Sequence, residues 1–295
     1  MPSSRDFSGL WIPLITPFTG DAGDTVDHPA LTRLVKHYAA AGVTGFVACG
    51  STGEAAALDK TEQLAVLDTV LEAAGSLPVV MGLSGYHLGQ TVAWVQELAQ
   101  RPIAGLLVPP PHYIRPAQAG LVQWFTALAD ASDKPLVVYD IPYRTGATLT
   151  LETLLTLATH TNIQAIKDCG GDAGKTQALI ADGRLQVLAG EDAQVFSTLA
   201  LGGAGAITAS AHLCTAQFVQ VMRLLRQGDL ARARALWQSL VPVVNAVFAE
   251  PNPAVIKAAL AHQGLIKDGL RLPMLAASNG ATEHLLATAA RVATA

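Results

Sequence analysis

Eight short apolar runs recur along the chain, and their spacing restricts the fold more than any other feature. They occupy residues 9–18, 45–50, 78–84, 104–110, 135–141, 163–168, 185–192 and 205–210. Each run is continuously apolar, as expected of parallel strands that are covered on both faces. The stretches between them, such as residues 28–42, 61–75 and 150–161, have the periodicity of amphipathic helices.

Strands that alternate with helices at intervals of about 20–35 residues predict a (β/α)8 barrel, the TIM barrel of the α/β class. A doubly wound sheet is the alternative, but it usually has fewer strands and a glycine fingerprint after the first strand, which residues 15–23 lack. After about residue 215 the strand pattern stops and only helical patterns follow. We therefore predict a barrel over residues 1–225 and a C-terminal helical extension over residues 226–295. Asn252 before Pro253 predicts the start of one of these helices.

The composition agrees with a large core and excludes two kinds of partner. Of 295 residues, 51% are hydrophobic and 14% are charged, and the formal net charge is -4. This balance gives no electrostatic reason to expect nucleic acid or an anionic membrane surface as partner. The low charge also favours extra buried surface between subunits.

The cysteines and the first residues bear on the compartment. Three cysteines, Cys49, Cys169 and Cys214, are an odd number, which favours free thiols in a reducing compartment over a disulfide framework. The start, MPSSRDFSGLWIPLITPF, is a poor match to a signal peptide because Pro13 and Pro17 interrupt its apolar run. No stretch approaches the roughly 20 apolar residues of a membrane helix. We expect a cytoplasmic protein.

Lys167 ends the sixth apolar run, in the sequence QAIKDCGG. Lysine is seldom buried, and a strand-end lysine that extends to solvent beside Asp168 is one interpretation. In a barrel, however, the strand ends that lead into the βα loops carry the chemistry. A lysine in apolar surroundings loses hydration, which favours its neutral amine, and a neutral amine forms Schiff bases with ketones.

Other polar residues follow the predicted strands and would share this rim. Ser51 and Glu54 have the spacing of a helix capping box, and the same loop could bind a small anion. Tyr139 is a candidate for proton transfer or a plug of the barrel, and Arg144 is a candidate for carboxylate binding or a solvated loop residue. The eight histidines show no spacing typical of a metal site, so no metal is expected.

Eight short motifs, taken together, resemble the dihydrodipicolinate synthase and N-acetylneuraminate lyase family of pyruvate-dependent class I aldolases. They are ITPF (15–18), GSTGE (50–54), PHYIRP (111–116), YDIPYRTG (139–146), IKD (166–168), AGED (189–192), EPNP (250–253) and LRLPM (270–274). The resemblance implies a lyase that needs no cofactor beyond a Schiff base with its substrate, small-molecule substrates, and a homotetramer built from tight dimers.

The resemblance also implies roles for single residues. Lys167 matches the Schiff-base lysine and Tyr139 the tyrosine that donates and accepts protons. Ser51 and Tyr113 match the other hydroxyls of a relay, with Tyr113 reaching in from the adjacent subunit. The substrate-binding positions implied are Thr52 for the pyruvate carboxylate, Arg144 for the carboxylate of the aldehyde, and Gly190 and Ile207 for the pocket wall through their backbone.

The motif around Arg144 is similar to the synthase branch, which joins pyruvate to L-aspartate 4-semialdehyde and gives 4-hydroxy-tetrahydrodipicolinate in lysine and diaminopimelate synthesis. Three departures leave a second reaction open: Ser51 replaces the threonine of the synthases, Asp140 replaces a common asparagine, and residues 168–171 read DCGG instead of E-A-[ST]-G. The alternatives are an aldolase that cleaves a 2-keto-3-deoxy sugar acid or N-acetylneuraminate, and a non-catalytic barrel that senses a small molecule.

One regulatory expectation follows from the resemblance. Synthases that lysine inhibits typically present a His or Glu, an Asn, a Glu and a Tyr at the dimer interface. The matching positions here are Lys60, Tyr86, Gln90 and His112. A cationic ligand there would lie near the positive charge of Lys60 and would lack the carboxylate that the inhibited synthases provide. We expect lysine to inhibit weakly or not at all.

Overall fold

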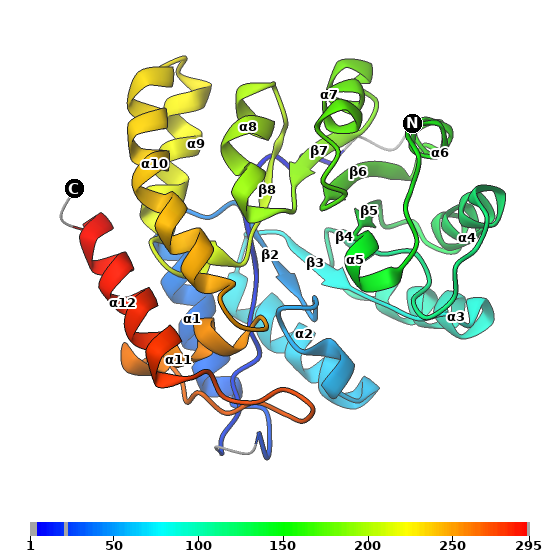
Figure 1. Ribbon diagram of the computed structural model, residues 1–295. Coiled ribbons are helices and arrows are strands. Elements are labelled where there is room, and N and C mark those ends of the chain that lie inside the picture. The colour runs from blue at the N-terminus through cyan, green and yellow to red at the C-terminus, as the bar shows by residue number, and fades with distance from the viewer. Residues whose placement is uncertain (1–4, 21–22, 294–295) are drawn as a thin grey trace. The chain divides into compact units, whose positions relative to one another are not determined.

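The computed structural model describes residues 5–20 and 23–293 (Figure 1). Its strands are parallel and close into a barrel in chain order, β1-β2-β3-β4-β5-β6-β7-β8. They are β1 Gly9–Pro13, β2 Gly45–Ala48, β3 Val79–Gly82, β4 Gly105–Val108, β5 Leu136–Asp140, β6 Ile163–Asp168, β7 Gln186–Ala189 and β8 Gly205–Ile207. The predicted (β/α)8 barrel is confirmed, and each strand lies inside the apolar run that predicted it.

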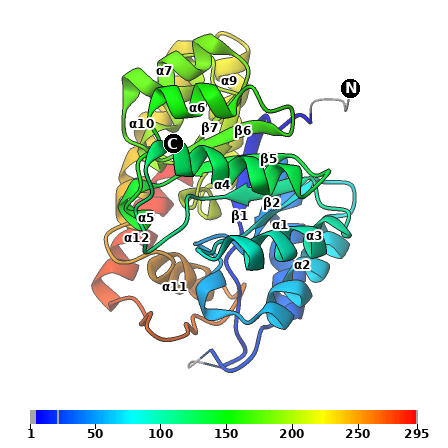
Figure 2. The same cartoon turned by 90° about the vertical axis from the view of Figure 1, so that its right-hand side faces the viewer.

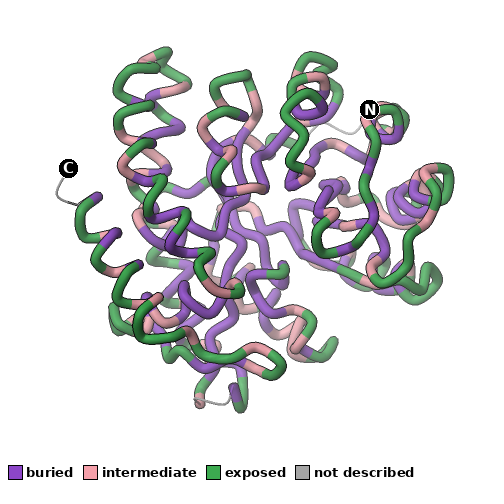
Figure 3. The backbone as a smooth tube through the Cα atoms, viewed as in Figure 1, coloured by how far each residue is buried: buried purple, intermediate pink, exposed green. Residues whose placement is uncertain are grey.

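The strands are buried almost throughout, as continuously apolar runs require (Figure 3). Only Gln164 in β6 and Gln186 in β7 are partly exposed strand residues within the described chain. Both side chains accept hydrogen bonds from the N-terminal segment: Gln164 Oε1 from the Arg5 amide at 2.9 Å and Gln186 Oε1 from the Phe7 amide at 2.8 Å. These two glutamines, near the starts of β6 and β7, therefore bind the chain segment that precedes β1.

Helices follow the strands and continue beyond them. They are α1 His28–Ala40, α2 Lys60–Ala74, α3 Leu88–Ala99, α4 Gln118–Asp130, α5 Pro142–Thr145, α6 Leu151–Leu157, α7 Ala173–Asp182, α8 Val195–Ala200, α9 Thr215–Arg226, α10 Leu230–Val247, α11 Ala254–His262 and α12 Asn279–Ala293. Helices α4, α6 and α7 lie outside strands β4 to β7 in both views (Figures 1 and 2). Aspartates cap several helices, among them Asp27 before α1 and Asp172 before α7.

The chain forms two compact units. The first comprises Met1–Gly9 and Pro78–Ile207, and the second comprises Leu10–Leu77 and Thr208–Ala295. The predicted C-terminal helices are present as α9 to α12, all in the second unit. Neither unit ends at residue 225, and the division into residues 1–225 and 226–295 stays a prediction.

The predicted helix start at Asn252 is wrong. Pro253 is the residue before α11, and no side chain caps this helix. The Asn252 side chain instead donates a hydrogen bond to Thr52 Oγ1 at 2.9 Å. Among the described residues, no helix combines the length and apolar character that crossing a membrane needs.

Candidate active site

Lys167 and Tyr139 lie side by side at the ends of two neighbouring strands of the first unit. They are register partners in the parallel pairing of β6 with β5. The Lys167 Nζ atom lies 4.3 Å from the centroid of the Tyr139 ring. The two side chains are 5% and 7% exposed. Because side chains alternate along a strand, both belong to one face of the barrel wall, and their successors Asp140 and Asp168 belong to the other.

Within the described chain, the Lys167 amine makes no hydrogen bond or ion pair, and it lies against the Tyr139 ring. Glu191, which follows β7, interacts electrostatically with Lys167. Burial and the neighbouring Asp192 raise the pKa of Glu191, and Lys167 opposes that rise. Among residues 5–20 and 23–293, the Lys167 nitrogen therefore has no hydrogen-bond acceptor, and it is available to a ligand.

Gly190 lies close against the Lys167 side chain. A Cβ at position 190 would lie 2.6 Å from Lys167 Cγ and 2.6 Å from Cys169 Sγ. Any larger residue would displace the lysine, so glycine is required here by close approach. Burial raises the pKa of the Cys169 thiol to about 12. Since the thiolate is the reactive form, the raised pKa disfavours reaction at this thiol.

The other predicted residues of the first unit differ in burial. Ile207 ends β8 and is 2% exposed. Tyr113, in the loop after β4, is 91% exposed and has a φ of 71°. A bulky residue with positive φ marks strain that is often kept for function. Arg144 lies exposed in the short helix α5, with its guanidinium 6.0 Å from the Tyr143 ring.

The second unit holds the loop after β2. Thr52 is 3% exposed and its hydroxyl accepts the hydrogen bond of Asn252, whereas Ser51 is exposed. The capping box predicted for Ser51 and Glu54 is wrong: these residues form a turn, and Glu54 has a φ of 53°. The capping box lies eight residues later, where Asp59 and Glu62 begin α2.

Glu54 has a different partner, which sequence reasoning missed. Its carboxylate forms an ion pair with Lys257 of α11, and both side chains are buried. Lys257 also donates to the Gly269 carbonyl oxygen at 2.8 Å and lies 4.1 Å from the Phe18 ring centroid. Burial lowers the pKa of Lys257 to about 8, against the opposing effect of Glu54. The run AVIKAAL, with a lysine among apolar residues, was the signal that could have revealed it.

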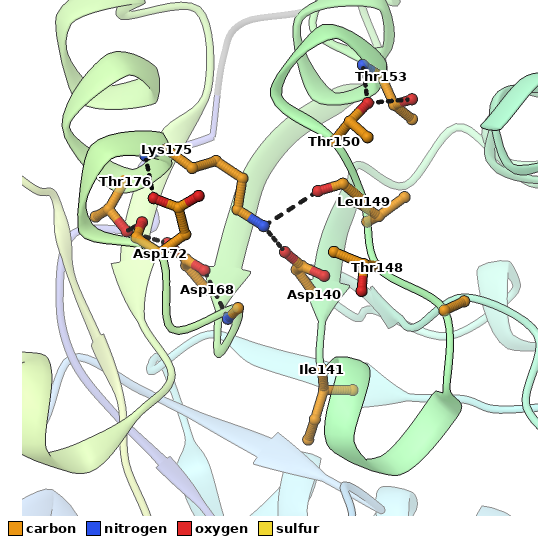
Figure 4. Close-up of polar contacts among 12 residues, drawn as sticks. Asp140, Ile141, Thr148, Leu149, Thr150, Thr153, Asp168, Asp172, Lys175 and Thr176 are labelled. Atoms are coloured by element: carbon orange, nitrogen blue, oxygen red, sulfur yellow. Dashed lines mark hydrogen bonds and ion pairs between the residues drawn. The ribbon is translucent and has the colours of Figure 1, made fainter.

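A second buried pair in the first unit was also missed (Figure 4). Lys175 of α7 donates to Asp140 Oδ2 at 2.5 Å and to the Leu149 carbonyl oxygen at 3.1 Å. On the next strand, Asp168 accepts from the Thr176 hydroxyl at 2.5 Å and from the Gly170 amide at 2.9 Å. Burial raises the pKa of Asp140, and Lys175 opposes the rise. The sequence around Lys175 carries no signal for this pair.

Metal ligands do not gather in the described part of the chain: no group of three or more His, Cys, Asp or Glu side chains there could hold an ion. The first unit thus offers a buried amine beside a phenol, a glycine that leaves space for the lysine, and an exposed arginine in the short helix after β5. This set suits carbonyl chemistry at the amine.

The sequence matches the family model described as the dihydrodipicolinate synthetase family over residues 6–292. The 4-hydroxy-tetrahydrodipicolinate synthase of Sorangium cellulosum is 38% identical over 293 residues, which is 98% of this chain and 97% of that protein. The dihydrodipicolinate synthase of Thermotoga maritima has a crystal structure that superimposes with a TM-score of 0.94, at 28% identity, over 99% of this chain and 100% of that one.

A third similar protein was crystallised with a ligand. The chloride-inhibited dihydrodipicolinate synthase of Acinetobacter baumannii, complexed with pyruvate, gives a TM-score of 0.93 at 30% identity and covers 97% of this chain and 99% of that chain. The match of the family model to almost the whole sequence, together with these relatives and the closed barrel, shows that the chain belongs to the dihydrodipicolinate synthetase family.

Proposed function

We propose that the protein is a class I, lysine-dependent lyase that condenses pyruvate, held as a Schiff base on Lys167, with L-aspartate 4-semialdehyde to give 4-hydroxy-tetrahydrodipicolinate. The observation that carries the proposal is the buried Lys167 amine, which lies against Tyr139 and has no acceptor among the described residues. Relatives that bear the name of this synthase support the choice of substrates.

The reaction begins at the amine. The Lys167 nitrogen attacks C2 of pyruvate, and loss of water leaves an imine that draws electrons from the adjacent carbon. Loss of a proton from C3 gives the enamine, whose C3 forms the new bond to the aldehyde carbon of the semialdehyde. The amino group of the semialdehyde then attacks C2, closes the ring and releases Lys167. No metal or organic cofactor takes part in this scheme.

The remaining residues serve proton transfer and binding. Tyr139 donates and accepts protons beside the amine, and Ser51 and Tyr113 continue the hydroxyl relay. Thr52 binds the pyruvate carboxylate, while the backbone at Gly190 and Ile207 lines the pocket. Arg144 binds the carboxylate of the semialdehyde as a bidentate cation would.

The assembly and the compartment belong to the same proposal. We infer a homotetramer built from tight dimers in which Tyr113 enters the site of the neighbouring subunit. Its 91% exposure and its φ of 71° support a side chain held out from its own chain. A cytoplasmic location is in keeping with Cys49, Cys169 and Cys214, which are all free thiols.

The substrate is tested with Arg144→Ala. The variant should lose about 100-fold in kcat/KM for the semialdehyde, because a charge-assisted pair to its carboxylate is removed. Formation of the borohydride-trapped pyruvate adduct should stay at the wild-type level. Arg184→Ala is the matched control, since it removes an exposed arginine from the loop before β7, at the opposite strand ends.

Two results would contradict the proposal. Wild-type protein that leaves the semialdehyde intact but cleaves a 2-keto-3-deoxy sugar acid or N-acetylneuraminate would establish the aldolase reaction instead. Pyruvate binding without an adduct or turnover of either substrate class would indicate a sensor.

A further inference from the structure

The two strands that carry Lys167 and Tyr139 end in a pair of buried carboxylates. Asp140 follows Tyr139 and Asp168 follows Lys167, and the two aspartates are register partners. They are 0% and 2% exposed. Their side chains belong to the face of the wall opposite the amine, toward the surrounding helices.

One turn of α7 binds both carboxylates (Figure 4). Lys175 pairs with Asp140, and its sequence neighbour Thr176 donates to Asp168. The start of the helix is fixed by Asp172, which accepts a hydrogen bond from the Lys175 amide at 3.0 Å. The first turn of α7 therefore joins the ends of β5 and β6 at the residues directly after the two candidate catalytic side chains.

Lys175 makes one more contact, with the chain segment that carries Arg144, the proposed ligand of the aldehyde's carboxylate. Its ammonium donates to the carbonyl oxygen of Leu149, which is fully buried. Leu149 ends the segment 141–149, which leaves β5 and carries Arg144 in α5. Asp140 directly precedes this segment and Leu149 is its last residue. The Lys175 ammonium binds both, so it connects the two ends of the segment.

Gly170 leaves the space that this link needs. A Cβ at position 170 would lie 2.6 Å from Lys175 Nζ and 2.7 Å from Asp140 Oδ2. The turn after β6 therefore passes close to the ion pair. This is a close approach that only glycine permits.

We propose that Lys175 is a positioning residue for the second substrate: through Asp140 and the Leu149 carbonyl it holds segment 141–149, and with it Arg144, in the conformation that receives the aldehyde. The inference rests on the proposed function for the identity of that aldehyde. It assigns no chemical step to Lys175, which lies on the opposite face of the wall from the Lys167 amine.

The test uses Lys175→Met, which removes the ammonium and keeps most of the side-chain length. The KM for aspartate semialdehyde should rise about 10- to 100-fold, as expected when a binding group is displaced by about an ångström. The KM for pyruvate and the fraction of protein trapped with pyruvate and borohydride should stay within about twofold of wild type, because Lys167 and Tyr139 are untouched. Lys134→Met, in the loop before β5, is the matched control and should change neither constant.

A second measurement does not depend on any substrate. Amide hydrogens of segment 141–149 should exchange about 10-fold faster or more in Lys175→Met than in wild type, because the link between the ends of the segment is lost. Amides of α6 should exchange at the wild-type rate. If wild-type protein does not consume the semialdehyde, the proposed function fails, and this exchange result alone decides the positioning inference.

The double variant Asp140→Asn/Lys175→Met tests whether a defect of Lys175→Met comes only from misfolding. It removes both charges, so no unpaired carboxylate stays buried, and it should trap pyruvate even if Lys175→Met does not. It should still show the raised aldehyde KM, since the Leu149 carbonyl has lost its donor. A wild-type aldehyde KM in either folded variant, or an equal rise in both KM values, would overturn the inference, and so would unchanged exchange of segment 141–149.

Discussion

Lys167 in β6 and Lys257 in α11 are both buried lysines, and their surroundings differ in one respect. Lys257 is 0% exposed, pairs with Glu54 and donates to the Gly269 carbonyl. Lys167 is 5% exposed and faces the Tyr139 ring at 4.3 Å, without an ion pair or hydrogen bond inside the described chain. Lys175 belongs with Lys257, because Asp140 and Leu149 bind its ammonium.

In this fold, the partners of a buried lysine distinguish a structural role from a chemical one. A buried ammonium with a carboxylate and a carbonyl around it is held in place, and its donors are occupied. A buried amine that lies against an aromatic ring without an ion pair is costly to the fold and is free to bond to a ligand. The same residue type thus has opposite roles, and the partners decide which.

Lys167→Met gives the largest expected effect. Turnover of pyruvate and the semialdehyde should fall by about 10,000-fold or more, because the covalent intermediate is lost. The same variant should unfold at a slightly higher temperature than wild type, since a buried polar nitrogen without a hydrogen bond in the described chain is replaced by an apolar chain. Steady-state kinetics and thermal denaturation measure the two effects. A variant that is both inactive and clearly less stable would place Lys167 with the structural lysines.

Lys257→Met should show the opposite pattern. It leaves the Glu54 carboxylate buried without its partner, which should cost about 3–5 kcal/mol in the free energy of unfolding. Urea denaturation measures the loss. The double variant Glu54→Gln/Lys257→Met should recover most of that stability, because no buried charge is left unpaired. If the single variant lost less than about 1 kcal/mol, the pair would contribute no more to stability than an exposed salt bridge does.

The pH dependence of stability tests a buried base of the second unit. His212 is 2% exposed; its Nε2 accepts from the Ile15 amide at 3.3 Å and its Nδ1 donates to the Ala209 carbonyl at 2.8 Å. Burial lowers its pKa from 6.5 to about 4. Between these values the unfolded chain binds a proton that the folded chain does not, so stability falls as the pH drops through this window.

The loss attributable to His212 should reach about 3 kcal/mol near pH 4. Denaturation curves recorded from pH 7 to pH 4 measure it. His212→Asn, which keeps one donor and one acceptor, should flatten the pH dependence by that amount. His262→Asn, at an exposed position, is the matched control and should leave the slope as in wild type. An unchanged slope in His212→Asn would contradict the assignment.

The smallest expected effect concerns free lysine as a ligand. Its ammonium needs a carboxylate, as Lys257 needs Glu54, and none is present among Lys60, Tyr86, Gln90 and His112. The Tyr86 and His112 rings contact each other edge to face at 5.4 Å. Lysine at about 1 mM should change the condensation rate by less than about twofold. Half-maximal inhibition below that concentration would mean that another acidic group completes the site.

The barrel and the position of Lys167 could be predicted because both are local features of the sequence. Strands covered on both faces must be apolar throughout, so eight apolar runs marked eight strands and placed Lys167 at the end of the sixth. The same rule placed Tyr139 near the end of the preceding run, and in the structure the two residues are register partners.

The ion pairs could not be predicted in this way, because their partners lie far apart in the chain. Lys175 and Asp140 are separated by 35 positions, and nothing in either segment specifies the other. The capping box at Ser51 and Glu54 failed for a related reason: the spacing fits, but burial against Lys257 decides the conformation of Glu54. Asn252 was assigned to a helix start, and its contact with Thr52, 200 positions away, overrides that local preference.

Reductive trapping followed by peptide mapping tests most directly whether Lys167 alone among the buried lysines is the reacting amine. Protein incubated with pyruvate and borohydride should carry one reduced adduct, on the peptide that contains Lys167, while Lys175 and Lys257 stay unmodified. An adduct on either of the paired lysines, or no adduct on a folded protein that binds pyruvate, would contradict the account.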